Sequence, residues 1–305
     1  MKKIALLLIY LILFTAACDT NNSNHKEDSN LESTEKIFKD DTGNEIKIPK
    51  NPKNIAVLHP TYVGALVKFG HKPIAVPEFV NKNKVLNDAT QGIKRIDNTS
   101  IEQITHQKPD LIITTTQDKN IKKLQKISPT VAFDAEKSNY KDNTKKLATL
   151  VNETSKAKQW IKEWDTQMAK DRKELEPVIK EKSISVLQQT PKGTMAFSNH
   201  LGRGTEILYD GYKMKQPKAL AQATKNKFAT PINPENFADY IGDFAVIATN
   251  GKQNTPFENT NYWRNLSAVK NKNIIKFDVT VTQYNDPISL EKQRDIFYKA
   301  LKNIK

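Results

Sequence analysis

A lone arginine between two glycines is the residue whose position in this sequence best suits ligand chemistry. The segment Gly202-Arg203-Gly204 comes shortly before the apolar stretch 207–209, which is compatible with a helix. A Gly-X-Gly turn lets the backbone come close to another group, and a helix N-terminus favours negative charge. From this segment alone, a tight turn that carries a solvated arginine is an equally good interpretation.

The other residue types that could perform chemistry are dispersed along the chain. A protein site for Zn²⁺ or Mn²⁺ needs three or four converging ligands, whereas the histidines lie far apart in sequence, at His25, His59, His71, His106 and His200. An enzyme on the same fold is a second alternative. The chain has no Gly-rich phosphate loop, no G-x-S-x-G motif and no paired His/Cys set. We therefore expect neither directly bound metal nor catalytic residues.

The N-terminus indicates export and lipidation. Two lysines, an apolar stretch over 4–14 and small residues before Cys18 predict a signal peptide over 1–17, too short in its apolar part to span a membrane. Cys18 is the only cysteine and follows two alanines, as in lipoprotein processing, although Thr15 stands where the usual motif has leucine. The alternative is a buried thiol. A diacylglyceryl group on Cys18 would supply the two acyl chains that stable anchoring needs.

The polar segment 18–36 contains a single leucine and cannot bury a core, so we interpret it as a flexible tether. We expect a lipid-anchored protein on the extracellular face of the cell membrane. The net charge is +14, and loss of Lys2 and Lys3 with the signal peptide leaves +12. Because the lysines are scattered and the chain is exported, this charge favours solubility and contact with an anionic cell envelope over binding to nucleic acid.

Hydrophobic periodicity predicts the architecture. Strands alternate with helices over 37–152 and again over 183–305, which indicates βαβ units, and residues 204–211 are expected to form a helix ended by Gly211. Between these stretches a period of 3.6 residues predicts one long helix within 153–182, with Pro177 in its last turns. The expected fold class is α/β: two α/β lobes with mostly parallel sheets, joined by one long α-helix, with a ligand cleft between the lobes.

Six segments carry a resemblance to a known family. The chain resembles the class III substrate-binding proteins of ABC importers, and most of all the lipid-anchored ferric hydroxamate-binding proteins of Gram-positive bacteria. The segments cover nearly the whole mature chain and read "PKNIAVLHPTYVGALVKFGHKPIAV", "IEQITHQKPDLII", "IKKLQKISPTV", "LGRGTEILY", "TNYWRNL" and "YNDPISLEKQR". The resemblance implies a receptor without a cofactor that binds an iron(III)-siderophore complex. Alternative ligands within the class are a catecholate siderophore, haem or a corrinoid.

The resemblance also implies the residues of the site. Arg203 would hydrogen-bond the iron-chelating oxygens, which suit a guanidinium because it is a fixed fork of donors. Further ligand contacts are expected from the aromatic residues Tyr62, Tyr140, Phe197 and Tyr284 and from the histidines His59 and His200. For His59, a half-buried position at a strand end is an equally good interpretation. The chain departs from the family over 195–201, which lacks the family's tyrosine and tryptophan, and at 282–283, where Thr282 and Gln283 replace aromatic residues, so the pocket should be less aromatic.

Two glutamates are expected to contact the transporter. In the family one exposed glutamate on each lobe pairs with arginines of the permease, and the matching residues are Glu102 and Glu235. Each would lie in the first turn of a helix, after Ser100 and Asn233, so helix capping is the alternative. The expected partners are thus the siderophore, an ABC permease with its ATPase, and the membrane through Cys18. We expect a monomer.

Overall fold

The computed structural model describes residues 34–136, 139–251 and 255–304. The predicted signal peptide, Cys18 and the tether as far as residue 33 lie outside the described residues. The first element is an antiparallel hairpin of β1 (Glu35–Lys39) and β2 (Glu45–Pro49). The hairpin therefore begins within two residues of its expected start.

The first lobe contains a five-stranded sheet that is parallel throughout, in the order β5-β4-β3-β6-β7. Most of its strand residues are buried, as expected for a parallel sheet covered on both faces. Its strands are β3 (Ile55–Val57), β4 (Ala75–Pro77), β5 (Lys94–Ile96), β6 (Leu111–Thr115) and β7 (Thr130–Phe133). Its helices are α1 (Pro60–Lys68), η1 (Glu78–Lys82), α2 (Lys84–Ala89), α3 (Ile101–His106), α4 (Ile121–Leu124) and α5 (Tyr140–Leu150).

The second lobe contains a mixed sheet in the order β10-β9-β8-β11-β12, in which β8, β11 and β12 pair in parallel and β9 runs antiparallel to both of its neighbours, β8 and β10. Its strands are β8 (Ile184–Thr190), β9 (Gly193–Phe197), β10 (Ala229–Ile232), β11 (Phe244–Thr249) and β12 (Ile274–Asp278). Its helices are η2 (Glu206–Gly211), α7 (Lys218–Ala223), η3 (Pro234–Asn236), α8 (Phe237–Tyr240), η4 (Pro256–Asn259), α9 (Asn261–Arg264), α10 (Ser267–Lys270) and α11 (Pro287–Lys302). The two α/β lobes are confirmed, and the parallel pattern is broken where a tight turn returns β8 into β9.

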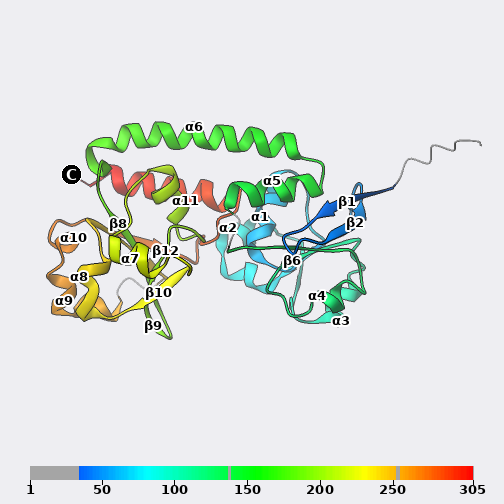
Figure 1. The fold of residues 1–305 in the computed structure, drawn as a ribbon, viewed down its shortest axis with the longest axis horizontal. Helices are drawn as coiled ribbons and strands as arrows, with labels where there is room; N and C mark the ends of the chain where they lie inside the picture. The colour runs from blue at the N-terminus through cyan, green and yellow to red at the C-terminus, as the bar shows by residue number, and fades with distance from the viewer. Residues whose placement is uncertain (1–33, 137–138, 252–254, 305) are drawn as a thin grey trace, which may run out of the picture. The chain divides into compact units, whose positions relative to one another are not determined.

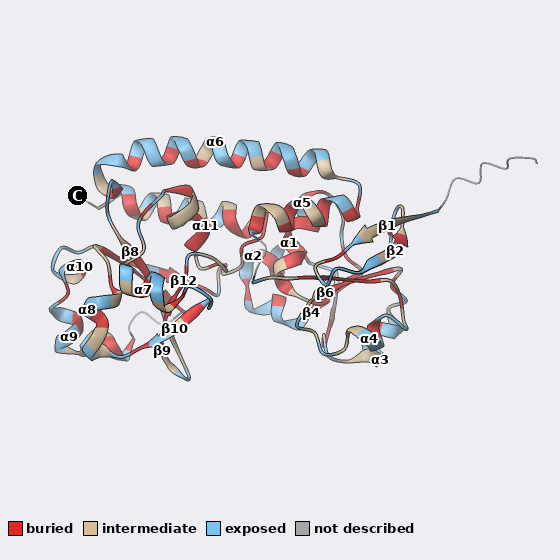
Figure 2. Cartoon of the chain, viewed as in Figure 1, coloured by how far each residue is buried: buried red, intermediate tan, exposed pale blue. Residues whose placement is uncertain are grey.

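The long helix α6 (Thr154–Ile179) confirms the predicted connection (Figure 1). It packs on α5 of the first lobe and on η2 and α11 of the second. Figure 2 shows its exposed outer side and the buried residues that face these helices. One acid lies on the buried side: Asp171 accepts hydrogen bonds from Arg294 of α11 at 2.5 and 2.6 Å. Pro177 does not end the helix, which continues to Ile179.

The lobes also meet directly, beside α6. Helix α1 packs on α11, and it approaches so closely that a Cβ on Gly64 would lie 1.8 Å from Oδ1 of Asp286. Two backbone hydrogen bonds join α2 to the segment after β12, from Lys84 N to Thr280 O at 2.8 Å and from Val85 N to Val281 O at 3.0 Å. The connection between the lobes is therefore wider than a single helix.

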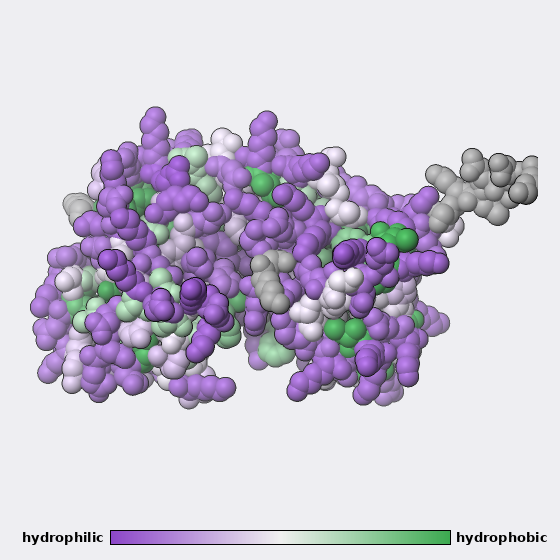
Figure 3. Space-filling view, viewed as in Figure 1, coloured by the Kyte–Doolittle hydropathy of each residue, from purple (hydrophilic) through white to green (hydrophobic). Residues whose placement is uncertain are grey.

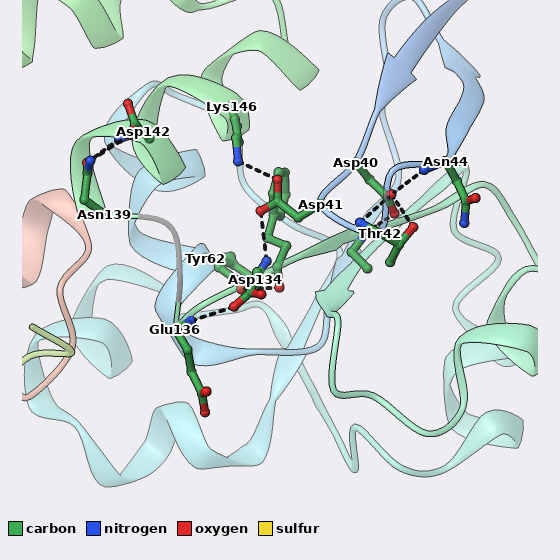
Figure 4. Close-up of polar contacts among 12 residues, drawn as sticks. Asp40, Asp41, Thr42, Asn44, Tyr62, Asp134, Glu136, Asn139, Asp142 and Lys146 are labelled. Atoms are coloured by element: carbon green, nitrogen blue, oxygen red, sulfur yellow. Dashed lines mark hydrogen bonds and ion pairs between the residues drawn. The ribbon is translucent and has the colours of Figure 1, made fainter. Parts of the chain in front are cut away.

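The turn of the β1–β2 hairpin is bound to the end of β7 (Figure 4). Asp40 Oδ2 accepts a hydrogen bond from Ala132 N at 3.1 Å, and Asp41 Oδ2 accepts one from Asp134 N at 2.9 Å. Lys146 of α5 donates to Asp41 Oδ1 at 2.5 Å. These contacts hold the start of the loop that leads from β7 towards α5.

Candidate functional site

The loop that carries Arg203 has an unusual backbone. Four consecutive residues have positive φ: 78° at Leu201, 87° at Gly202, 59° at Arg203 and 86° at Gly204. Glycine adopts this conformation readily, whereas other residues do so at a cost and mostly at functional sites. A Cβ on Gly202 would lie 2.0 Å from the carbonyl oxygen of Gln283. The absence of a side chain at Gly202 thus lets the loop pack against the backbone of Gln283.

A buried glutamate, Glu206, holds this loop. Its carboxylate accepts hydrogen bonds from the backbone N–H groups of Leu201 and Gly202, at 2.8 Å and at 2.9 and 3.0 Å. Thr205 Oγ1 and Asn285 Nδ2 also donate to it, at 3.1 and 2.9 Å. The expected negative charge at this helix N-terminus is therefore the chain's own carboxylate. Glu206 was not among the predicted site residues, although an acid directly after the Gly-Arg-Gly segment was a signal for it.

The following helix, η2, also differs from the expectation. Residues Glu206–Gly211 form a π-helix, which lies within the predicted helix 204–211 and begins two residues later. Single turns of π-helix occur frequently at functional sites. Here the wider turn lies directly after the strained loop, so the irregular backbone forms one continuous segment.

The side chain of Arg203 is held in place and keeps free donors. Its Nε donates to Gln188 Oε1 at 2.6 Å, and its guanidinium carbon lies 4.2 Å from the ring centroid of Phe197. Within the described residues Nη2 has no hydrogen-bond partner. Burial lowers the pKa of the guanidinium, but the group remains charged. Phe197 is 3% exposed and is not among the lining residues, so in this structure its ring supports the arginine.

Arg203 faces a cavity of about 360 Å³ that we call the Arg203 pocket. Residues of both lobes line it: His59, Thr61, Thr115, Gln117, Ala135, Glu136, Leu201, Arg203, Phe228, Gln283 and Tyr284. The lining residues from the first lobe lie at or just after the carboxyl ends of β3, β6 and β7. Ligands commonly bind at this edge of a parallel sheet. The structure therefore places Arg203, Tyr284 and His59 together.

Two predicted residues near β3 behave differently. His59 lines the Arg203 pocket, and burial lowers its pKa to about 4, so its imidazole is neutral at pH 7. Tyr62 has no exposed surface, and its hydroxyl donates to the carbonyl of Phe133 at 3.1 Å. Tyr62 is therefore not among the residues that line the Arg203 pocket, because the start of α1 turns its ring into the core of the lobe.

A second cavity of about 430 Å³ adjoins the first, and we call it the His200 pocket. Its lining residues are Glu136, Asn139, Tyr140, Lys141, Asn199, His200, Leu201, Glu206, Asp210 and Asn285. His200 is half-buried there. Tyr140 is 5% exposed: its hydroxyl donates to Asp210 Oδ2 at 3.0 Å and accepts from Trp164 Nε1 at 2.8 Å. Tyr140 therefore joins the two lobes and offers the pocket little surface.

An aromatic residue that the sequence reasoning missed lies at the rim of the Arg203 pocket. Phe228 is 47% exposed and its ring centroid lies 6.4 Å from that of Phe197. The large hydrophobic side chains that are exposed in the described part of the chain are Ile37, Phe79, Phe228 and Tyr262. They lie on separate elements, and the face drawn in Figure 3 is mostly hydrophilic. Among these four residues, Phe228 is the one that lines the Arg203 pocket. Its exposed ring beside Arg203 is the feature that identifies it as a candidate ligand contact.

Residues 34–136, 139–251 and 255–304 contain no group of three or more His, Cys, Asp or Glu side chains arranged to hold a metal ion. Over the same residues, no helix is both long enough and apolar enough to cross a membrane.

The comparisons with known proteins agree with this geometry. A family model described as "Periplasmic binding protein" matches residues 55–279. The iron(3+)-hydroxamate-binding protein FhuD of Bacillus subtilis (strain 168) is 33% identical, over 97% of this chain and 96% of its own length. This chain belongs to the periplasmic binding protein family. It is therefore a binding protein and not an enzyme.

Solved structures of the family show the same fold. The FhuD protein from S. pseudintermedius is 34% identical and superposes with a TM-score of 0.85, over 89% of this chain and 99% of its own. FhuD2 from Staphylococcus aureus with bound ferrioxamine B is also 34% identical, with a TM-score of 0.80, over 83% of this chain and all of its own. Both structures therefore share the two-lobed fold of this chain, and FhuD2 holds ferrioxamine B.

Both glutamates predicted to contact the permease are exposed. Glu102 lies in the first turn of α3, where the cap is formed by Ser100 Oγ, which accepts from Gln103 N at 3.3 Å. Glu235 lies in η3, whose capping box uses Asn233 and Asn236. Neither glutamate carboxylate has a hydrogen bond or ion pair with a described residue. The caps are thus made by other side chains, and the capping alternative does not account for either glutamate.

Proposed function

We propose that this chain is a membrane-anchored receptor that binds a ferric hydroxamate siderophore and delivers it to an ABC permease for iron uptake. The observation that carries the proposal is Arg203, whose guanidinium is held by Gln188 and Phe197 with donors left over towards a pocket between the lobes. The similarity to the iron(3+)-hydroxamate-binding protein FhuD of Bacillus subtilis and to FhuD2 with bound ferrioxamine B supports the hydroxamate ligand.

The chemistry of the ligand fits this pocket. Three hydroxamate groups carry one negative charge each and neutralise Fe³⁺, so the complex has polar oxygens without a large net charge. A triply negative catecholate complex would need several cations, whereas among the described residues that line the Arg203 pocket Arg203 is the one cation. The ligand supplies all donors to the iron, so the protein needs no metal ligand of its own.

Substitution of Arg203 tests the ligand assignment. We expect Arg203→Ala to weaken binding of an iron(III) trihydroxamate by about ten- to hundredfold, which corresponds to the loss of one hydrogen bond to a charged group. The measurement is quenching of tryptophan fluorescence during titration. The matched control is Arg264→Ala, because Arg264 is exposed and its side chain donates to Asn259 O at the end of η4 and to Asn261 Oδ1 of its own helix α9. Unchanged affinity in Arg203→Ala would contradict the proposal.

We further propose that Glu102 and Glu235 contact the permease, since both carboxylates are exposed and unpaired. Glu102→Ala combined with Glu235→Ala should abolish uptake of labelled iron and leave siderophore affinity unchanged. The control pair is Glu45→Ala with Glu78→Ala, which removes two other exposed carboxylates. Normal uptake by the first pair, at an unchanged melting temperature, would overturn the docking assignment.

We also propose that diacylglyceryl Cys18 anchors the protein and that the segment after it acts as a tether. The support comes from the sequence: Cys18 is the only cysteine and directly follows an apolar stretch and two alanines. Cys18→Ala should release the protein from the membrane fraction into the medium or leave it unprocessed. Mass spectrometry of the mature N-terminus checks the lipid directly.

A further inference from the structure

The charged side chains of the two adjoining pockets are largely compensated, with one exception. The charged residues that line the pockets, apart from the histidines, are Glu136, Lys141, Arg203, Glu206 and Asp210. Lys141 forms ion pairs with Asp165 at 2.6 Å and with Asp210 at 3.1 Å, and Asp210 also pairs with Lys213 at 3.0 Å. Lys141 and Asp210 therefore offer little net charge to a ligand.

Arg203 and Glu206 compensate each other in a different way. They belong to the same loop, and the Glu206 carboxylate accepts hydrogen bonds from neutral donors. Burial lowers the pKa of Arg203, and the nearby carboxylate of Glu206 partly opposes that shift. His59 adds no charge at neutral pH, because burial lowers its pKa to about 4.

The carboxylate that remains is that of Glu136. It is exposed, it lines both pockets, and within the described residues it has no hydrogen-bond or ion-pair partner. Its backbone N–H donates to Asp134 Oδ1 at 3.0 Å, and Figure 4 shows its side chain pointing away from that turn. The contact between Asp41 and Asp134 N fixes the start of the loop, so the position of Glu136 is supported by the hairpin.

We propose, resting on the function proposed above, that Glu136 selects iron(III) hydroxamate complexes that carry a pendant cationic group, such as a primary ammonium. The iron-hydroxamate core itself is uncharged, so it lies between Arg203 and the surrounding aromatic rings without a charge preference. A pendant ammonium within reach of Glu136 then gains an ion pair, whereas a pendant carboxylate is repelled by it. Glu136 is thus a specificity-determining residue, distinct from Arg203, which binds the core.

Three matched ligands test this assignment. They are the iron(III) complex of a linear trihydroxamate that ends in a primary amine, its N-acetylated derivative and its N-succinylated derivative. The titrations are done at about pH 8, where an ordinary histidine carries no charge, so the three experiments differ only in the charge of the ligand's terminal group. We expect the amine complex to bind about two- to fivefold more tightly than the acetylated one, as for a partly exposed ion pair, and the succinylated one to bind most weakly. High salt should reduce these differences.

Two variants of Glu136 and one control complete the test. Glu136→Gln should remove the preference for the amine, Glu136→Lys should reverse it in favour of the succinylated complex, and Glu45→Gln, an exposed change on β2, should preserve it. If wild type binds all three complexes equally, or if Glu136→Gln keeps the preference, the inference is wrong while the hydroxamate function stands. If none of the three complexes binds to wild type, the proposed function fails and this inference fails with it.

Discussion

The two walls of the Arg203 pocket are built in different ways. The wall of the first lobe follows the ends of three neighbouring parallel strands, and its residues include His59, Thr115, Ala135 and Glu136. The wall of the second lobe is formed mainly by the loop before η2 and the segment before α11, which supply Leu201, Arg203, Gln283 and Tyr284, and Phe228 lies at its rim. The first wall rests on regular hydrogen bonding between β3, β6 and β7, whereas the second depends on four residues with positive φ around one buried carboxylate.

This difference indicates where single substitutions should matter. A sheet edge distributes its support over many backbone hydrogen bonds, so the loss of one side chain changes little. A strained loop persists only while its surroundings hold it, and here those surroundings are Glu206 and two glycines. The wall that carries the ligand-binding arginine is therefore the more fragile of the two.

The largest expected effect is that of Glu206→Ala. The change leaves the buried donors of Leu201, Gly202 and Asn285 without their acceptor, which should lower the free energy of unfolding by roughly 3–5 kcal/mol. The control on the other wall is Thr115→Ala at the end of β6, with an expected loss below about 1 kcal/mol. Urea unfolding measures both variants. Equal losses on the two walls would contradict the comparison.

A pair of glycines separates backbone strain from close approach. Gly202→Ala must accept both φ of 87° and a Cβ 2.0 Å from Gln283 O, so we expect it to lose about 2–4 kcal/mol of stability and to weaken ligand binding. Gly43→Ala has the same φ of 87° but no atom within 4 Å, so it should lose about 1 kcal/mol and bind ligand normally. If Gly43→Ala is as destabilising as Gly202→Ala, the contact with Gln283 is unimportant.

The features that could be predicted from sequence are those with a local signal. Helix α6 follows from apolar periodicity, and the position of Arg203 follows from its two glycines. The buried state of Tyr62 depends on Phe133, which is 71 residues away, and the contact of Glu206 with Asn285 spans 79 residues. The antiparallel return of β8 into β9 also requires the pairing partner of each strand. No local pattern contains these contacts, so the roles of Tyr62 and Glu206 became clear only in the folded chain.

The junction of the two walls contains a buried acid that should make stability depend on pH. Burial raises the pKa of Asp286, the N-cap of α11, from 3.8 to about 6. Between these values the folded chain keeps a proton that the unfolded chain has released, so the contribution of Asp286 to stability falls as the pH rises through this interval. Asp286→Asn keeps an oxygen for the hydrogen bond from Ser289 N and removes the buried charge.

We therefore expect Asp286→Asn to be more stable than wild type by up to about 3 kcal/mol above pH 6, and the difference should vanish near pH 4. Denaturant unfolding at a series of pH values measures the difference between the two proteins, in which other titrating groups cancel. The control is Asp239→Asn, an exposed change on α8. A difference that is constant with pH would show that Asp286 is not the group responsible.

The smallest expected effect is the movement of one wall relative to the other when ligand binds. Three connections oppose rotation of the lobes: the continuous helix α6, the contact of Gly64 with Asp286, and the backbone hydrogen bonds of α2 with Thr280 and Val281. We expect free and loaded protein to differ by only a few degrees. Because Cys18 is the only native cysteine, a Cys18→Ser background allows spin labels at Glu102→Cys and Glu235→Cys, one on each lobe. The distance between these labels should shift with ligand by less than the width of its distribution, as should that of a control pair at Glu45→Cys and Glu102→Cys within one lobe. A large shift confined to the first pair would show that the walls close on the ligand, and the Gly64–Asp286 contact would then have to separate in one of the two states.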